Sequence, residues 1–229
     1  MTVFSNLLIS GKPVGLISYD VNQELSAVGR ATFVIDRAAV VGSLVNFDIG
    51  LGDKANRFSS YYVETSTPVG DGTFIIFCRE FMEMLWTDQV IALRHTTARD
   101  VLNSIEAKSK IKIIKHAALY LDNEVPYFYS CKTLFHALQS MGRVFNIPRY
   151  CFVQYPNGSI WAGSLDDLNE SKLLLDISEA LLKPLPVPVP DVFKFTMVSG
   201  LRVGARLNGK VIKKLSVSNS EMVATCIAQ

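Results

Sequence analysis

Cys131 and His136 are the two residues of this chain whose chemical types could act together in catalysis. A cysteine thiolate beside a histidine base forms a common nucleophile pair. The two residues are five positions apart at the start of a predicted helix, and the residues around them follow a packing pattern. We therefore interpret Cys131 and His136 as structural residues, and a Cys/His hydrolase is the least favoured hypothesis.

The other chemistry-bearing residues are scattered. His95 and His116 have no second His, Cys or carboxylate at the spacing of a metal site. Asp166 and Asp167 are adjacent, so their side chains point apart and do not form the acid pair of a glycosidase. Acidic residues elsewhere, such as Glu80, occur singly. The sequence therefore predicts that the protein is not an enzyme and has no catalytic residue, no metal site and no cofactor-binding residue.

Motifs for phosphate or nucleic-acid binding are also missing. No glycine-rich phosphate loop is present. The aromatic pairs at residues 61–62 and 128–129 are not interleaved with basic residues, which a single-strand-binding surface needs. Lys210, Lys213 and Lys214 form a modest basic group. We interpret this group as the solvated side of a hairpin, and the alternative is a strand that faces a polyanion.

The composition describes a globular protein with a large core. Of the 229 residues, 49% are hydrophobic and 19% are charged, and the net charge is +2. Such a balance gives no general attraction to nucleic acid or to an acidic membrane. The four cysteines form no C-x-x-C pair, so reduced thiols are expected. The N-terminus lacks the basic start of a signal peptide, and the longest uncharged apolar run, residues 38–47, is too short to span a bilayer. We expect a soluble protein made in the cytoplasm, without a membrane anchor.

The order of the predicted elements indicates two β modules around an α/β segment. Period-two alternation and turn residues predict six strands in the first module and six in the second. The first six are residues 3–10, 14–22, 30–36, 44–50, 58–67 and 73–79, and the last six are 150–155, 159–162, 193–198, 201–207, 210–218 and 222–228. Apolar residues at helical spacing predict helices near 97–108 and 132–145, and a capping box of Thr97 and Asp100 opens the first.

The predicted fold class is α+β, mainly β, with two small β-barrels joined by a small α/β segment. We predict a first barrel in residues 1–96, an α/β connecting domain in residues 97–148 and a second barrel in residues 149–229. The proline-rich residues 183–191 are expected to form a stiff connector within the second barrel. Residues 171–182 fit a strand, a helix or one of each.

Several segments follow one another in a recognisable order. They are GKPV...YDV, GRATFVID, VGSLVNFDIG, RFSSYYVE and DGTFIIFCRE, then ALRHTTARDVLNSIEAKSKIKI and VPYFYSCKTLFHALQSMGRVFNIPRYCFVQYPNGSIWAG. This order resembles the baseplate-hub proteins of phage tails, a group that includes the late-control protein D family, the hub of contractile tails and the N-terminal part of VgrG spike proteins. The resemblance covers most of residues 1–165. The chain is shorter than most members and carries no recognisable spike or fused hydrolase.

The resemblance implies a structural role in the tail of the virion. In such hubs each chain carries two related β-barrels, and three chains form a ring of six barrels. The ring meets the sixfold tail tube on one side and a threefold spike on the other. We therefore expect a homotrimer that joins a tail-tube or distal tail protein to a separate central spike protein. Its lumen would let DNA pass without specific binding, and assembly would take place in the host cytoplasm.

A ring of this kind needs strand edges that pair between subunits. Residues 193–198 and 222–228 are the candidates for such edges. If DNA passes through the ring, the lumen should be weakly charged or acidic, with Lys210, Lys213 and Lys214 pointing away from it. The alternative hypothesis is a monomeric β-barrel module that binds peptide, carbohydrate or nucleic acid.

Overall fold

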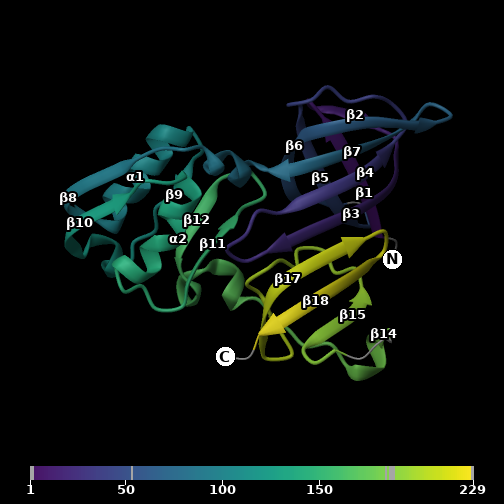
Figure 1. Ribbon diagram of the computed structural model, residues 1–229. Coiled ribbons are helices and arrows are strands. Elements are labelled where there is room, and N and C mark those ends of the chain that lie inside the picture. The colour runs from purple at the N-terminus through teal and green to yellow at the C-terminus, as the bar shows by residue number, and fades with distance from the viewer. Residues whose placement is uncertain (1–2, 53, 184, 186–188, 228–229) are drawn as a thin grey trace. The chain divides into compact units, whose positions relative to one another are not determined.

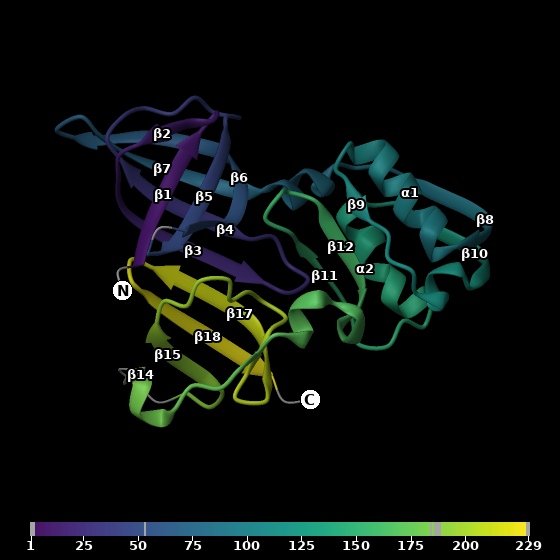
Figure 2. The same ribbon diagram turned by 180° about the vertical axis from the view of Figure 1, so that it is seen from behind.

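The computed structural model describes residues 3–52, 54–183, 185 and 189–227. The chain divides into two compact units, of which unit 1 comprises residues 1–80 and 170–229, and unit 2 comprises residues 81–169. Unit 1 is therefore built from both ends of the chain. In Figure 1 the purple and blue strands of the N-terminal part adjoin the yellow strand β17, and Figure 2 shows the same neighbourhood from behind.

The elements of each unit have the following bounds. Unit 1 contains β1 (Val3–Ile9), β2 (Lys12–Val14), β3 (Leu16–Glu24), β4 (Arg30–Ile35), β5 (Leu44–Leu51), β6 (Lys54–Gly70), β7 (Thr73–Glu80), β13 (Leu174–Leu175), η5 (Glu179–Leu181), β14 (Leu182–Lys183), β15 (Val192–Thr196), β16 (Arg206–Leu207), β17 (Lys210–Ser218) and β18 (Glu221–Ile227). Unit 2 contains η1 (Phe81–Trp86), β8 (Ile91–Thr97), α1 (Ala98–Ser109), β9 (Ile113–Ile114), η2 (Leu119–Asp122), β10 (Glu124–Ser130), α2 (Leu134–Val144), β11 (Tyr150–Gln154), β12 (Ile160–Ser164) and η3 (Leu165–Asp167). The short 3-10 turn η4 (Asn169–Lys172) crosses from unit 2 into unit 1.

The strands of unit 1 form one sheet of 13 strands, in the order β14-β15-β18-β17-β3-β4-β7-β6-β5-β1-β2, with β16 paired to β17 and β13 paired to β16. The antiparallel pair β3–β17, in which Val21 lies opposite Val217, joins the two ends of the chain. The mainly β, α+β class is confirmed. Closed barrels are not confirmed. The pairing path of the described strands ends at β2 and β14, which are three and two residues long, so neither half of the sheet closes on itself.

The alternation predicted for the N-terminal strands is confirmed by burial. In β4, Ala31, Phe33 and Ile35 are buried, whereas the residues between them are half-buried or exposed. Phe33 packs on Phe47 of β5 with ring centroids 5.3 Å apart, and Phe47 contacts Tyr19 of β3 at 4.8 Å. Buried aromatic rings in tilted contact contribute both apolar burial and favourable ring geometry. These strands therefore share one aromatic core.

Unit 2 contains the two predicted helices. Thr97 caps α1 through the predicted capping box with Asp100, and Thr133 caps α2 by accepting a hydrogen bond from the backbone N–H of His136. The helices bury apolar faces that include Leu102 and Leu138. Neither helix in the described part of the chain is long and apolar enough to cross a membrane.

The division into units differs from the predicted domains. The hairpin β11–β12 was predicted to begin the second barrel, but β12 pairs in parallel with β9, so that Ile160 lies opposite Ile113. Strand β8 was predicted to belong to the first barrel, and it pairs with β10. The predicted boundaries after residues 96 and 148 therefore fall inside unit 2.

Two segments of the C-terminal part needed the structure for their assignment. Residues 171–182 form short pieces, η4, β13, η5 and the start of β14, rather than one regular element. In the predicted strand 201–207 only Arg206–Leu207 is extended, because a turn places the backbone N–H of Ala205 3.3 Å from the carbonyl of Arg202. Of the predicted connector 183–191, residues 184 and 186–188 lie outside the described residues.

Candidate functional site

The Cys131 and His136 side chains form no hydrogen bond with each other in the part of the chain that the structure describes. Both residues are exposed, and within the described part of the chain neither side chain makes a hydrogen bond. His136 instead supplies a backbone N–H to the Thr133 cap at 3.1 Å. The described residues also contain no group of three or more His, Cys, Asp or Glu side chains that could hold a metal ion. The interpretation of Cys131 and His136 as structural residues agrees with these contacts.

His116 belongs to a polar cluster of unit 2 that sequence spacing did not reveal. Its Nε2 lies 2.7 Å from the Tyr120 hydroxyl, which donates to Asp167 at 2.7 Å and accepts from the Ser164 N–H at 2.9 Å. Gly163 allows this approach, because a Cβ there would lie 2.5 Å from the His116 ring. Burial lowers the pKa of His116 and raises that of Tyr120. The cluster therefore holds a neutral imidazole and a protonated phenol, which suits a structural link between β12 and η2.

Glu80, treated as an isolated acid in the sequence, is buried at the end of β7 in unit 1. Its Oε2 accepts a hydrogen bond from the Gly29 N–H at 2.8 Å, and its Oε1 lies 3.3 Å from Gln23 Nε2 and 3.4 Å from Ser59 Oγ. Burial raises the pKa of Glu80 to about 7, although these hydrogen bonds oppose the shift. Glu80 is in phase with the buried residues Ile76 and Cys78 of β7, and this was the available sequence signal.

The free edges of the unit 1 sheet are the first candidate for assembly contacts. The prediction that residues 222–228 form an edge strand is wrong. Within the described part, Met222 of β18 pairs with Phe195 of β15 on one side and with Val217 of β17 on the other. The second predicted edge, residues 193–198, largely forms β15, whose other side pairs, among the residues that the structure describes, with the two residues of β14. A cavity of about 260 Å³ lies along this edge and is lined mainly by apolar side chains such as Val192 and Phe193.

The three lysines near the C-terminus lie on or beside β17. A bulge between Ile212 and Lys214 keeps Ile212 buried while both Lys213 and Lys214 stay out of the core. Lys213 lies 3.7 Å from Glu24, and Lys210 pairs with Asp191. Two of the three charges are therefore compensated within the chain, which favours the interpretation as a solvated strand surface over that of a polyanion-binding strand.

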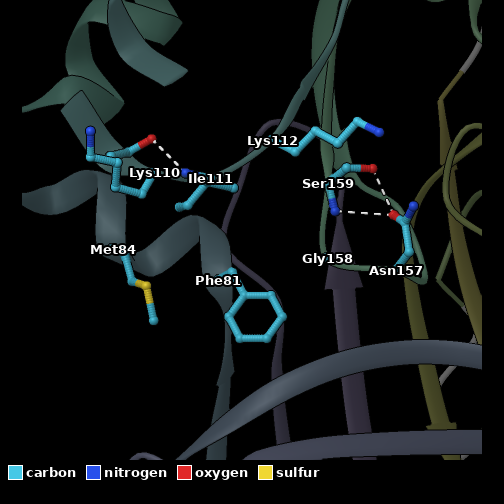
Figure 3. A pocket seen from close by; sticks show the side chains of 9 residues that line it. Phe81, Met84, Lys110, Ile111, Lys112, Asn157, Gly158 and Ser159 are labelled. Atoms are coloured by element: carbon cyan, nitrogen blue, oxygen red, sulfur yellow. Dashed lines mark hydrogen bonds between the residues drawn. The ribbon is translucent and has the colours of Figure 1, made fainter. Parts of the chain in front are cut away.

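A pocket of about 320 Å³ opens on unit 2 between η1, the end of α1 and the β11–β12 hairpin. Figure 3 shows Phe81 on one side, Lys110, Ile111 and Lys112 opposite, and Asn157 and Ser159 at the hairpin. The hairpin approaches the Phe81 ring so closely that a Cβ at Gly158 would lie 2.5 Å from it. The pocket combines an apolar wall with two lysines and contains no acidic lining residue.

Comparison with known proteins identifies the fold. No family model matches the chain. The chain is 25% identical over 230 residues to an uncharacterised 58.7 kDa protein in the lys 3' region of Haemophilus phage HP1 (strain HP1c1). The match covers 97% of this chain but only 42% of the phage protein, so the chain spans less than half the length of that relative.

Solved structures match more completely. The 43 kDa tail protein of prophage MuSo2 from Shewanella oneidensis aligns with a TM-score of 0.75 and 12% identity over 99% of this chain and 97% of that one. The tail protein from Neisseria meningitidis MC58 aligns with a TM-score of 0.72 and 11% identity over 99% and 96%. The chain has the fold of phage tail proteins. This tail-protein fold includes both units, because the alignments cover nearly the whole chain.

The tail-protein fold also occurs in a secretion machine. The E. coli c3393 protein, described as a component of the type VI secretion system that is similar to the T4 tail proteins gp27 and gp5, aligns with a TM-score of 0.63 and 11% identity over 97% of this chain and 76% of that one. The resemblance to tail hubs seen in the sequence is therefore confirmed as a shared fold. None of the three descriptions is that of an enzyme, in agreement with the prediction for this chain.

Proposed function

We propose that the chain is a structural hub component of a phage tail. Three copies would form a pseudo-sixfold ring that joins the hexameric tail tube to a threefold central spike and lines the DNA conduit. The observation that carries the proposal is the joining of the two ends of the chain into one sheet through β3 and β17, within a fold shared with tail proteins. Two β parts in each of three chains supply six similar positions around a ring.

The free edges of unit 1 support assembly through strand pairing. Within residues 3–52, 54–183, 185 and 189–227, β15 has an apolar cavity along its sparsely paired side, and β2 at the other end of the sheet pairs with β1 alone. Unpaired strand edges tend to recruit another strand, so a soluble protein usually covers them in its working assembly. We therefore assign the β15 edge to the contact between neighbouring subunits of the ring.

The charges near β17 support a conduit that does not hold DNA. Lys213 and Lys210 are paired with acids of the same chain, so they add little net positive potential. Tight binding to DNA requires several cations that are free to neutralise phosphates. A wall with compensated charges would let DNA pass.

The native mass of the protein tests this proposal. Light scattering from 1 to 100 µM, alone and with a tail-tube and a spike protein, should show a species of three times the 25.4 kDa chain mass. Val192→Lys, which places a charge on the β15 edge, should shift the equilibrium toward monomer, whereas Thr67→Lys on the exposed part of β6 should not. A monomer at every concentration, also with both partners present, would overturn the ring and favour a monomeric binding module.

A further inference from the structure

We propose that the unit 2 pocket binds a short segment of a partner protein in which an acidic side chain stands next to an apolar one. The pocket is formed by residues Phe81, Met84, Lys110, Ile111, Lys112 and Asn157 together with neighbouring backbone. Its volume of about 320 Å³ is at the lower end of the range for ligand pockets, which suits one or two side chains rather than a large cofactor. The inference concerns unit 2 alone and does not depend on the ring.

The apolar wall provides the first half of the recognition. Met84 is 44% exposed and lies in η1 with Phe81, which the close approach of Gly158 holds against the hairpin. Trp86, at the end of η1, is 52% exposed and stacks on Phe135 with ring centroids 4.6 Å apart. Exposed apolar side chains that stay fixed in position lose little entropy when a partner side chain packs on them. An apolar residue of the partner would be anchored here.

The polar side chains of the pocket provide the second half of the recognition, because within the described part of the chain Asn157 and Ser109 keep unused hydrogen-bond donors. Asn157 Oδ1 already accepts from the N–H and the hydroxyl of Ser159, at 3.1 and 2.6 Å, which leaves its Nδ2 hydrogens available. Ser109 Oγ accepts from the Ile111 N–H at 3.2 Å, so its own hydrogen is also available. Donors of this kind select a group that only accepts, such as a carboxylate.

The charge of the pocket also favours a carboxylate. Lys110 and Lys112 line it, no acidic residue does, and neither lysine forms an ion pair within the described part of the chain. Figure 3 shows the two lysine side chains extending in opposite directions, away from each other. A carboxylate at the pocket would therefore lie between the stems of two cations whose flexible side chains can turn toward it. Each exposed ion pair should change the affinity by up to about fivefold.

A peptide fits these features better than a nucleic acid does. Single-stranded nucleic acid binds along a track of several cations with aromatic faces for stacking. The pocket offers two separated lysines, and Phe81, Met84 and Ile111 make part of its wall apolar. One carboxylate with an adjacent aliphatic or aromatic side chain would use the donors, the charge and the apolar wall together.

Methyl NMR of methionine tests the proposal in the full chain. The chain has six methionines, and the Met84 signal can be assigned by loss in Met84→Leu. The probe is acetyl-Leu-Glu-Phe-Glu-Leu-amide, and its matched control has Gln in place of Glu. The acidic peptide should shift the Met84 methyl saturably. The affinity should fall about tenfold for the Gln peptide and for the Lys110→Gln/Lys112→Gln variant, and stay unchanged for Lys12→Gln, an exposed lysine of unit 1.

Four results would overturn the proposal. Equal binding of the Gln peptide would show that charge is not recognised. Tighter binding of a thymidine oligonucleotide would make the site a nucleic-acid contact, and a Met84 shift on raising the protein concentration alone would assign it to a second copy. No saturable shift at millimolar peptide would mean that the pocket is not a site. Unchanged melting temperatures of the glutamine variants would confirm that all of them are folded.

Discussion

The Glu80 carboxyl group accepts a hydrogen bond from the backbone N–H of Gly29, 51 residues earlier in the chain, at 2.8 Å. The Glu80 N–H in turn donates to the Gly29 carbonyl at 3.1 Å. Glycine is required at this contact, since a Cβ at position 29 would lie 2.4 Å from the Glu80 carboxyl carbon. The pair fixes the β3–β4 turn to the last residue of β7, where the chain leaves unit 1.

Glu80 should make the stability of unit 1 depend on pH. Burial raises its pKa from the usual 4.5 to about 7, so the folded state holds the proton more tightly than the unfolded chain does. This contribution to the free energy of unfolding is complete below pH 4.5 and is lost as the pH rises through 7. Each pKa unit corresponds to about 1.4 kcal/mol, so the loss should be about 3 kcal/mol at most. Urea unfolding followed by far-UV circular dichroism between pH 5 and 8 measures it.

Glu80→Gln provides the comparison, because glutamine has the shape of the protonated acid but does not titrate. The variant should flatten the dependence on pH between 5 and 8, whereas Asp88→Asn, at an exposed acid of unit 2, should leave it unchanged. If Glu80→Gln kept the slope of the original protein, another group would be responsible and the raised pKa would be wrong.

Local patterns in the sequence were sufficient to predict individual strands and helices, but they did not predict which strands pair with one another. The alternation of Ala31, Phe33 and Ile35 fixes which face of β4 is buried, and the capping box fixes the start of α1, because both depend on neighbours in sequence. The pairing of β12 with β9 depends instead on contacts between distant residues such as Ile160 and Ile113. No local signal distinguishes that hairpin from one in a second barrel.

The candidate sites show the same difference between features that depend on neighbours in sequence and features that depend on distant residues. The interpretation of Cys131 and His136 as structural residues stays a prediction, whereas the burial of Glu80 could be read from its phase in β7. The unit 2 pocket joins Phe81, Lys110 and Asn157, which are at least 29 residues apart in sequence, so no motif marks it. Its recognition required the tertiary structure.

Removing the cap of α1 should weaken unit 2. Thr97 Oγ1 accepts from the Asp100 N–H at 3.2 Å, and the Asp100 carboxylate accepts from the Thr97 N–H at 3.0 Å. Thr97→Ala should lower the free energy of unfolding by about 1 kcal/mol, and Thr97→Ser, which keeps the hydroxyl, by much less. Both tryptophans, Trp86 and Trp161, lie in unit 2, so urea unfolding followed by tryptophan fluorescence isolates this unit. Equal losses in the two variants would refute the cap.

One of the four cysteines should react in the native protein. Cys131 is exposed, whereas Cys78, Cys151 and Cys226 are buried. Burial raises the pKa of Cys78 and Cys151 to about 12 and that of Cys226 to about 11, so these three hold little thiolate at pH 8. An Ellman titration should therefore find one fast thiol, and Cys131→Ser should find none. If a thiol of the Cys131→Ser variant reacted fast, at least one of the other three cysteines would be accessible, which would contradict their burial.

Gly158→Ala should destabilise unit 2 through two separable effects. Gly158 has a φ of 83°, which costs a residue with a Cβ about 1 kcal/mol. The new Cβ would also meet the Phe81 ring at 2.5 Å, and such crowding adds roughly 1–3 kcal/mol. A double-mutant cycle with Phe81→Ala separates the two, because alanine has no atom beyond Cβ, so it removes the crowding and leaves the backbone strain.

The cycle is again followed by tryptophan fluorescence. Gly158→Ala should cost about 1 kcal/mol in the Phe81→Ala background and at least twice that in the original protein. A coupling energy near zero would mean that the Phe81 ring moves aside at no cost, and the hairpin would then not hold the apolar wall of the pocket in place. A clear coupling would show that Gly158 and Phe81 set the shape of the pocket together, since backbone strain alone is equal in both backgrounds.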